Sequence, residues 1–277
     1  MPVEMPQIRT LNPLPRSASP PLANLKQVEN KDFQTVVVYG KGGNGKTYVG
    51  ISKTPTPIEW IDIDHRSDTQ YPRFKNRIGH LYQPNTKEEI ENAIAWAIHY
   101  LKEEYAKTGK KGTIVFDSYT KAKQIVKEDW LISQNRPSND KTSIEEKSII
   151  KATMMRMIDN IKHSQMNVVV TAEESIEIIG EEKDGKQRIK AVIGGVPKAE
   201  DDLEYFCDFI VHLYEAQVKK EGTNEYVKRY LWDFRKSSTS RILERTDLAP
   251  KEDCDWEKIM SEIELLKRVE MQGVTTP

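Results

Sequence analysis

The stretch Gly40-Lys41-Gly42-Gly43-Asn44-Gly45-Lys46-Thr47 fits the pattern G-x-x-x-x-G-K-[ST]. Before it, residues 34–39 (QTVVVY) form a β-branched apolar run that predicts a buried strand, and residues 48–52 suit the first turns of a helix. A glycine-rich turn between a strand and a helix presents backbone N–H groups and the positive end of the helix dipole to an anion. These eight residues therefore predict a nucleoside triphosphate site, in which Lys46 reaches the β and γ oxygens and Thr47 ligates Mg²⁺.

Composition sets wider limits on the chain. Its 277 residues are enough for one large α/β domain with appendages, and 37% hydrophobic with 31% charged residues is typical of soluble globular proteins. The net charge of −1 offers no global attraction to nucleic acid, so such binding would need local patches. Cys207 and Cys254 are too few for a disulfide framework or a zinc cluster. We expect a cytoplasmic protein (in a host cytoplasm if the chain is viral), with no secretory signal and no membrane span.

Three regions follow one another along the chain. Residues 1–30 contain six prolines and are expected to form an extended or disordered tail. Residues 31–246 alternate strand and helix signals, which predicts a mostly parallel sheet covered on both faces. Residues 247–277 should hold a docked helix, because residues 256–269 carry a helical apolar stripe. Within the middle region, strands are predicted at residues 58–62, 78–82, 113–117 and 168–171. Two helices are predicted to begin at the capping boxes Thr86/Glu89 and Thr142/Glu145. Two β-hairpins are predicted, one with its turn at Asp184-Gly185 and one that joins residues 208–214 to residues 226–234.

An aspartate ends the apolar strand 113–117, some 70 residues after the glycine-rich loop. Asp117 is therefore the expected Walker B carboxylate, holding Mg²⁺ through its bound water beside Thr47, with Ser118 as an assistant. An ordinary strand-end aspartate that caps the next helix would look the same in sequence.

Hydrolysis also needs a group that orients the attacking water. Asp62 and Asp64 follow the second strand, and alternation places both carboxylates on one side of an extended chain. Asp64 lies nearer the ligand-binding end of the sheet and is the preferred base, although either aspartate could instead cap a loop. Glu173 and Glu174, just past the strand 168–171, are candidates to sense the γ-phosphate.

The order of these motifs resembles the RecA-like ATPase core over about residues 33–245, and is most similar to the short phage-encoded RecA-like proteins of the AAA class. Some of those proteins assist single-strand annealing and recombination. The resemblance implies an Mg²⁺-dependent ATPase with an α/β fold and late β-hairpins, assembled as a homo-oligomeric ring or filament on single-stranded DNA. It assigns water activation to Asp64, where the family usually has Glu, and γ-phosphate sensing to Glu173, where the family usually has an amide.

The same resemblance indicates where DNA and a neighbouring subunit would bind. In RecA the loops after the third and fourth strands contact DNA, and here they correspond to about residues 119–141 and 174–200. The second loop contains Lys183, Lys186, Arg188 and Lys190, diluted by Glu181 and Glu182. RecA-like proteins also place basic residues that act in trans in a late strand; Arg235, Lys236 and Arg241 are the matching candidates, and a solvated basic loop is the plainer interpretation.

A second resemblance competes with the first. The segment from Lys41 to Thr47 also matches the deviant phosphate loop of the ParA, MinD and nitrogenase-iron-protein ATPases, with Lys41 as their signature lysine. That resemblance implies a nucleotide-switched positioning or assembly protein. We favour the RecA-like core, because Pro55 and Pro57 allow only a short helix after the loop. The two families differ in one topological point: the RecA-like core places strand 168–171 between the first strand and strand 113–117, whereas the ParA-like core pairs those two directly.

Overall fold

The structure is a computed structural model of the 277-residue chain. It describes residues 33–183, 186–197, 203, 207–219, 226–237, 251–252 and 254–271. The predicted tail at residues 1–30 and Arg241 lie outside these residues, and the predicted domain boundaries remain predictions.

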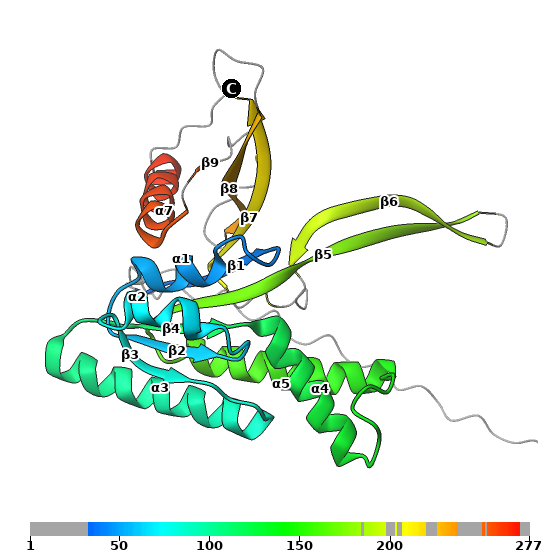
Figure 1. Cartoon of the computed structure of the whole chain (residues 1–277), viewed down its shortest axis with the longest axis horizontal. Helices are drawn as coiled ribbons and strands as arrows, with labels where there is room; N and C mark the ends of the chain where they lie inside the picture. Colours follow the sequence, from blue (N-terminus) through cyan, green and yellow to red (C-terminus); the bar gives the residue numbers. More distant parts are fainter. Residues whose placement is uncertain are drawn as a thin grey trace, which may run out of the picture. The chain divides into compact units, whose positions relative to one another are not determined.

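A mostly parallel sheet forms the centre of the described part (Figure 1). The strands run in the order β3-β2-β4-β5-β1-β7-β8-β9, with β6 paired to β5. From β3 to β7 all neighbours are parallel, whereas β8 and β9 are antiparallel additions and β6 returns antiparallel along β5. The fold is therefore the predicted α/β architecture with late hairpins. The strands are β1 (Thr35–Gly40), β2 (Ile58–Asp62), β3 (Ile78–Tyr82), β4 (Thr113–Asp117), β5 (Asn167–Lys183), β6 (Lys186–Pro197), β7 (Phe209–Lys219), β8 (Tyr226–Ser237) and β9 (Lys251–Glu252).

The position of β5 decides between the two predicted topologies. On one side β5 pairs with β1, placing Val168 opposite Thr35, and on the other it pairs with β4, placing Asn167 opposite Thr113. The first strand and the strand ending at Asp117 are therefore separated by β5 rather than hydrogen-bonded to each other. This is the order expected of a RecA-like core, and the ParA-like order is not observed.

Helices cover both faces of the sheet (Figure 1). Alternate β1 residues face opposite ways: Val37 and Tyr39 join the core beneath α3, α4 and α5, whereas Val36 and Val38 join the core beneath α1 and α7. A sheet buried on both faces explains why β1 and β4 are apolar almost throughout. The helices are α1 (Lys46–Ser52), α2 (Tyr71–Phe74), α3 (Lys87–Thr108), α4 (Tyr119–Ser133), α5 (Ile144–Lys162) and α7 (Trp256–Met271), with a short 3-10 turn η2 (Ser67–Thr69).

Three local expectations need correction. The capping box before α5 is Ser143/Glu146, one residue later than the predicted Thr142/Glu145 pair, because the Ser143 hydroxyl accepts from Glu146 N and the Glu146 carboxylate accepts from Ser143 N. The segment 119–141, expected as a loop, begins with helix α4, capped by Ser118. The strand predicted at 168–171 continues to Lys183, because β6 supplies it with a pairing partner.

The hairpin predicted around Asp184-Gly185 is present, since Lys183 pairs with Lys186; the two tip residues lie outside the described part. In the described residues, none of the helices combines the length and the apolar character needed to span a membrane.

Candidate functional site

The glycine-rich loop lies between β1 and α1, as its sequence predicts. Gly43 and Gly45 have φ values of 85° and 86°, a left-handed conformation that side chains disfavour. The loop contacts β7 through one hydrogen bond and one close approach. The Asn44 amide donates to the carbonyl of Leu213 at 3.0 Å, and a Cβ added to Gly40 would collide with that same carbonyl oxygen. Strand β7 thus fixes the position of the loop, which sequence reasoning did not foresee.

Lys46, the first residue of α1, reaches back across the loop. Its ammonium donates to the carbonyls of Gly40 and Lys41, both at 2.9 Å. Burial lowers the pKa of Lys46, while the charges of Asp117 and Glu173 oppose that shift. The cation is therefore held over the loop among acidic groups, where it would meet a bound phosphate. Lys41 is exposed, and among the described contacts it takes part through its backbone carbonyl, which accepts from the Lys46 ammonium.

Asp117, at the end of β4, lies beside the loop as predicted. Its carboxylate is buried and accepts from the Thr47 hydroxyl at 2.7 Å and from the Thr171 hydroxyl of β5. Burial is the main reason that the pKa of Asp117 is raised. Thr171 is an additional partner that sequence reasoning missed, because its approach depends on β5 lying next to β4.

The residues around Thr47 fit a magnesium ion. A hydroxyl and a carboxylate side by side are hard oxygen donors, and Mg²⁺ commonly takes one or two such protein ligands together with phosphates and water. The described residues contain no cluster of three or more His, Cys, Asp or Glu side chains that could hold a metal alone. Thr47 and Asp117 would thus hold the metal in the presence of nucleotide phosphates.

The two aspartates after β2 have different surroundings. Asp62 is fully buried and accepts hydrogen bonds from the backbone N–H groups of Arg66 and Ser67, at 3.2 and 2.9 Å. Asp64 is half-buried, and its Oδ1 accepts from the hydroxyl of Ser118 at 3.1 Å. Asp62 therefore closes the turn after the strand, and Asp64 lies on the side of Asp117 and Lys46, whose pKa values its charge influences.

Glu173 lies opposite Gly40 in the register of β5 and β1, at the same end of the sheet. Its backbone N–H donates to the hydroxyl of Thr120, at the start of α4, at 3.0 Å. The neighbouring Glu174 instead lies 3.4 Å from Nε2 of His212, on β7. Glu173 is thus the one of the two acids that the structure places near Lys46: burial lowers the pKa of Lys46, and the charge of Glu173 opposes that shift.

A cavity of about 440 Å³ lies next to the loop, and the sequence motifs did not predict it. Two tyrosines from different elements face it, Tyr48 from α1 and the exposed Tyr230 from β8. Its other walls are formed by Gly43, Asn44, Gly45, Val49, Leu213, Leu231, Cys254 and Asp255. A partly apolar hollow with aromatic walls, continuous with a phosphate loop, suits the nucleoside part of a nucleotide.

The late basic residues are only partly described. Arg235 and Lys236 belong to β8, where Lys236 lies opposite Ile210 of β7. Their side chains, Arg241, and the side chains of Lys183, Lys186, Arg188 and Lys190 in the β5–β6 hairpin lie outside the described part of the chain. Their proposed contacts therefore stay predictions.

The sheet order and the loop define a P-loop nucleotide-binding protein of RecA-like topology. Residues 32–241 match the family model described as an AAA domain, and the chain belongs to this family of P-loop ATPases. Among solved structures, the chain is similar to a KaiC-like protein, PH0186, from the hyperthermophilic archaeon Pyrococcus horikoshii. That match has 15% identity and a TM-score of 0.37, and it covers 75% of this chain and 81% of the other. A search of curated proteins finds no match.

Proposed function

We propose that the protein is an Mg²⁺-dependent ATPase that acts on single-stranded DNA. The observation that carries the ATPase part is the convergence of five groups at one edge of the parallel sheet: Lys46, Thr47, Asp64, Asp117 and Glu173. They lie at the carboxyl ends of β1, β2 and β4 and at the point where the parallel part of β5 ends. Ligands of parallel sheets bind at this edge. Five groups of the required chemistry, brought together from four separate segments, support phosphoryl transfer to water.

Each group has a defined task. The loop N–H groups and Lys46 bind the phosphates, and Thr47 with Asp117 would hold Mg²⁺, which neutralises charge on the β and γ oxygens when bound. Asp64 orients the attacking water, and Ser118 positions Asp64 through the 3.1 Å hydrogen bond. Glu173 responds to the presence of the γ-phosphate. The cavity between Tyr48 and Tyr230 accepts the base and ribose, with aromatic stacking as the main attraction.

The action on DNA is the finer part of the proposal. The RecA-like strand order supports it, because the alternative of a ParA-like switch predicts a direct pairing of β1 with β4 that the sheet does not have. We place the protein among recombination, annealing or replication accessories that work as homo-oligomers on a DNA strand.

Phosphate release from Mg-ATP, measured with and without a single-stranded oligonucleotide and with EDTA as a control, tests both parts. Hydrolysis that needs Mg²⁺ and rises with the oligonucleotide is expected. A rate of hydrolysis that does not change with the oligonucleotide at any protein concentration would overturn the DNA part of the proposal and would not affect the ATPase part.

A further inference from the structure

The turn that follows β2 is fixed at both of its ends by hydrogen bonds. At its start, the backbone N–H of Ile63 donates to the carbonyl of Asp117. Toward its end, the carboxylate of Asp62 accepts from the backbone N–H of Arg66 at 3.2 Å. The side chains of residues 64–66 therefore project from a backbone that is held in place on either side.

A short series of hydrogen bonds connects this turn to the phosphate loop. Asp64, two residues before Arg66, accepts from the hydroxyl of Ser118 at 3.1 Å. Ser118 directly follows Asp117, whose carboxylate accepts from the hydroxyl of Thr47 at 2.7 Å. The long side chain of Arg66 thus starts beside the groups that would surround the terminal phosphate of a bound nucleotide.

The guanidinium of Arg66 has no partner within the described part of the chain. Arg66 is exposed, and its side chain makes no hydrogen bond or ion pair there, although two aspartates closely precede it in the sequence. Both acids have other partners: the carboxylate of Asp62 accepts from backbone N–H groups, and Asp64 accepts from the hydroxyl of Ser118. The N–H donors of this guanidinium are therefore available to an anion from outside the chain.

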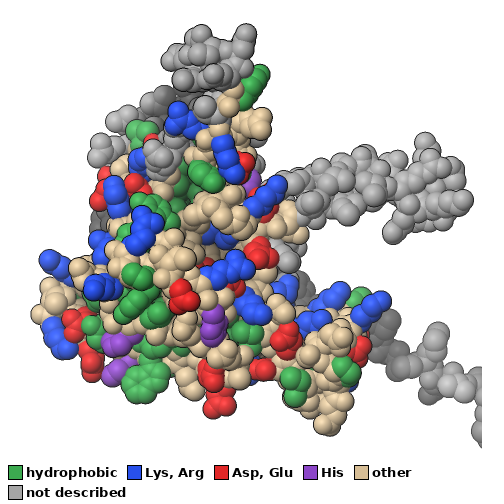
Figure 2. Space-filling model, viewed as in Figure 1, with side chains coloured by type: hydrophobic (Ala, Val, Ile, Leu, Met, Phe, Trp, Pro, Cys, Tyr) green, Lys and Arg blue, Asp and Glu red, His purple; other side chains and the backbone are tan. Residues whose placement is uncertain are grey.

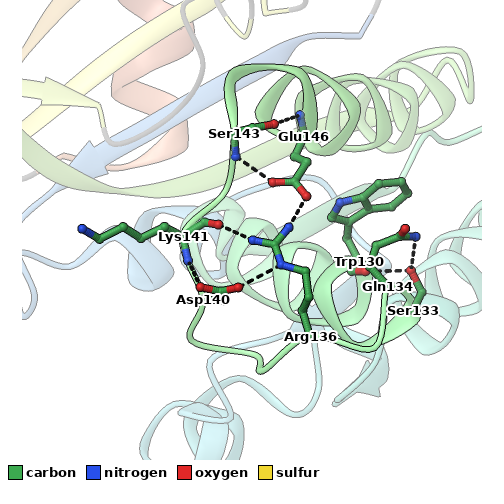
Figure 3. A network of polar contacts seen from close by, with 8 residues as sticks. All are labelled: Trp130, Ser133, Gln134, Arg136, Asp140, Lys141, Ser143 and Glu146. Carbon is green, nitrogen blue, oxygen red and sulfur yellow. Dashed lines mark hydrogen bonds and ion pairs between the residues drawn. The ribbon is translucent and has the colours of Figure 1, made fainter.

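Arg136 shows the contrasting case of an arginine that ties the structure together. Figure 3 shows its guanidinium in the α4–α5 turn, where it donates to Asp140 at 2.9 Å, to Glu146 and to the carbonyl of Lys141. With carboxylates and a carbonyl around the planar fork, Arg136 stabilises the turn and is engaged there. Arg66 makes no such contacts, so a role in holding the fold together does not account for its side chain.

The charge of Arg66 acts on the candidate ATPase site. Burial is the main reason that the pKa of Lys46 is lowered, and the charge of Arg66 lowers it further. The charges of Asp117, Glu173 and Asp64 oppose that shift. In Figure 2, Lys and Arg side chains lie beside Asp and Glu side chains near the centre of the face shown. Because several acids gathered in one place repel a triphosphate, a second cation near Lys46 offsets part of that repulsion.

We propose that Arg66 is a further catalytic residue, which binds the γ-phosphate of ATP held by its own subunit. This inference rests on the proposed ATPase function and adds one group to that site. A guanidinium stays charged at physiological pH, and its paired N–H donors match two phosphate oxygens. Because negative charge is spread over the γ-phosphoryl oxygens during transfer, the contact is stronger in the transition state than in bound ATP. This role within one subunit is separate from the role across a subunit boundary predicted for Arg235 and Lys236.

The contact to the γ-phosphate is tested without hydrolysis, by calorimetry on the full-length protein with Mg²⁺ and either AMP-PNP or ADP. ADP lacks the γ-phosphate, so the ratio of the two dissociation constants reports contacts to that group. Arg66→Gln should weaken AMP-PNP binding about tenfold, the scale of one hydrogen bond to a charged group, and should leave ADP binding unchanged within about twofold. Lys102→Gln removes one positive charge from an exposed position on α3 and should leave both constants unchanged. Equal effects of Arg66→Gln on the two ligands, including no effect on either, would overturn the proposal.

The catalytic role is tested by the turnover of Mg-ATP. In Arg66→Gln, kcat should fall roughly 100-fold or more, a larger change than the rise in KM, because the contact strengthens in the transition state. Arg66→Lys keeps the charge without the paired donors, and its kcat should lie between those of Arg66→Gln and the wild type. A kcat in Arg66→Gln equal to that of the wild type would overturn the catalytic role.

Mixing Arg66→Gln subunits with Lys46→Ala subunits tests whether the arginine acts within its own subunit. Mixed oligomers should recover no activity, because both residues must then belong to the same site. Recovery would show that Arg66 serves a neighbour and would overturn the proposal. A wild-type protein that does not hydrolyse ATP would count against the proposed function, whereas a selective loss of AMP-PNP binding in Arg66→Gln would still support the contact of Arg66 with the γ-phosphate.

Discussion

At the scale of single residues, the two aspartates after β2 show where sequence reasoning ends. Alternation along an extended chain places Asp62 and Asp64 on one side, and that argument holds only while the chain stays extended. Strand β2 ends at Asp62, and the backbone N–H groups of Arg66 and Ser67 fold back onto its carboxylate. The choice of Asp64 as the base stays a prediction. The structure places Asp64 beside the Ser118 hydroxyl, and the separation of its surroundings from those of Asp62 comes from a turn that local pattern does not encode.

Asp64→Asn tests the assignment of the catalytic base. The amide keeps the size of the side chain and a bond to Ser118, but it no longer accepts a proton from water. The turnover number should fall roughly 100-fold or more, the usual contribution of a positioned general base. Nucleotide affinity, measured with a fluorescent ATP analogue, should change little, because the lost interaction belongs to the transition state.

Lys41→Ala is the matched comparison, since a ParA-like site would depend on this lysine instead. We expect its turnover to stay close to that of the wild type. A wild-type turnover number in Asp64→Asn together with an inactive Lys41→Ala would contradict Asp64 as the catalytic base and favour the ParA-like site.

At the scale of elements, strands and helices with strong periodicity are predictable, and features that depend on a distant partner are not. The apolar runs of β1 and β4 and the cap of α3 at Thr86 are local signals, and the structure has a strand or a helix start at each of them. The continuous β5 and the attachment of the loop to β7 both rest on contacts with segments far along the chain. Periodicity over a short window carries no information about such partners.

Gly40→Ala tests the attachment of the phosphate loop to β7. The new methyl group would collide with the backbone carbonyl of Leu213, and a backbone atom cannot rotate away. The free energy of unfolding should fall by about 1–3 kcal/mol, the usual range for overpacking a tight contact, as measured by urea denaturation. Gly42→Ala is the control in the same loop, because its added Cβ meets nothing within 4 Å. If both variants lose the same stability, the close approach of β7 to Gly40 does not constrain the loop.

At the scale of the whole molecule, the strand order could be predicted from a family resemblance, whereas the contacts between one subunit and the next could not. Motif order indicated a RecA-like core, and the position of β5 confirms it. An assembly depends on surfaces that meet between copies, which a single chain does not display. The role of Arg235 and Lys236 across a subunit boundary is therefore a prediction for experiment.

Mixing two inactive variants tests that role. Lys46→Ala subunits lack the lysine proposed to bind phosphate but keep their basic late strand, whereas Arg235→Ala/Lys236→Ala subunits have the reverse defect. If the basic residues complete a neighbour's site, as arginine fingers do, mixed oligomers should recover part of the ATPase activity that each variant lacks alone. Absence of recovery, where light scattering and tagged pull-down show that mixed oligomers form, would favour a solvated basic strand.

The central claim is that Lys46 and the loop around it bind and activate ATP, and one comparison tests it most directly. Phosphate release from Mg-ATP is measured for the wild type and for Lys46→Ala, with thermal unfolding of both as the check on folding. Because the Lys46 ammonium bonds only to loop carbonyls among the described contacts, its removal should leave the fold intact. Turnover should fall roughly 100-fold or more, on the scale of removing a preorganised charge at the reacting phosphate. Equal hydrolysis by a well-folded Lys46→Ala protein would contradict the account.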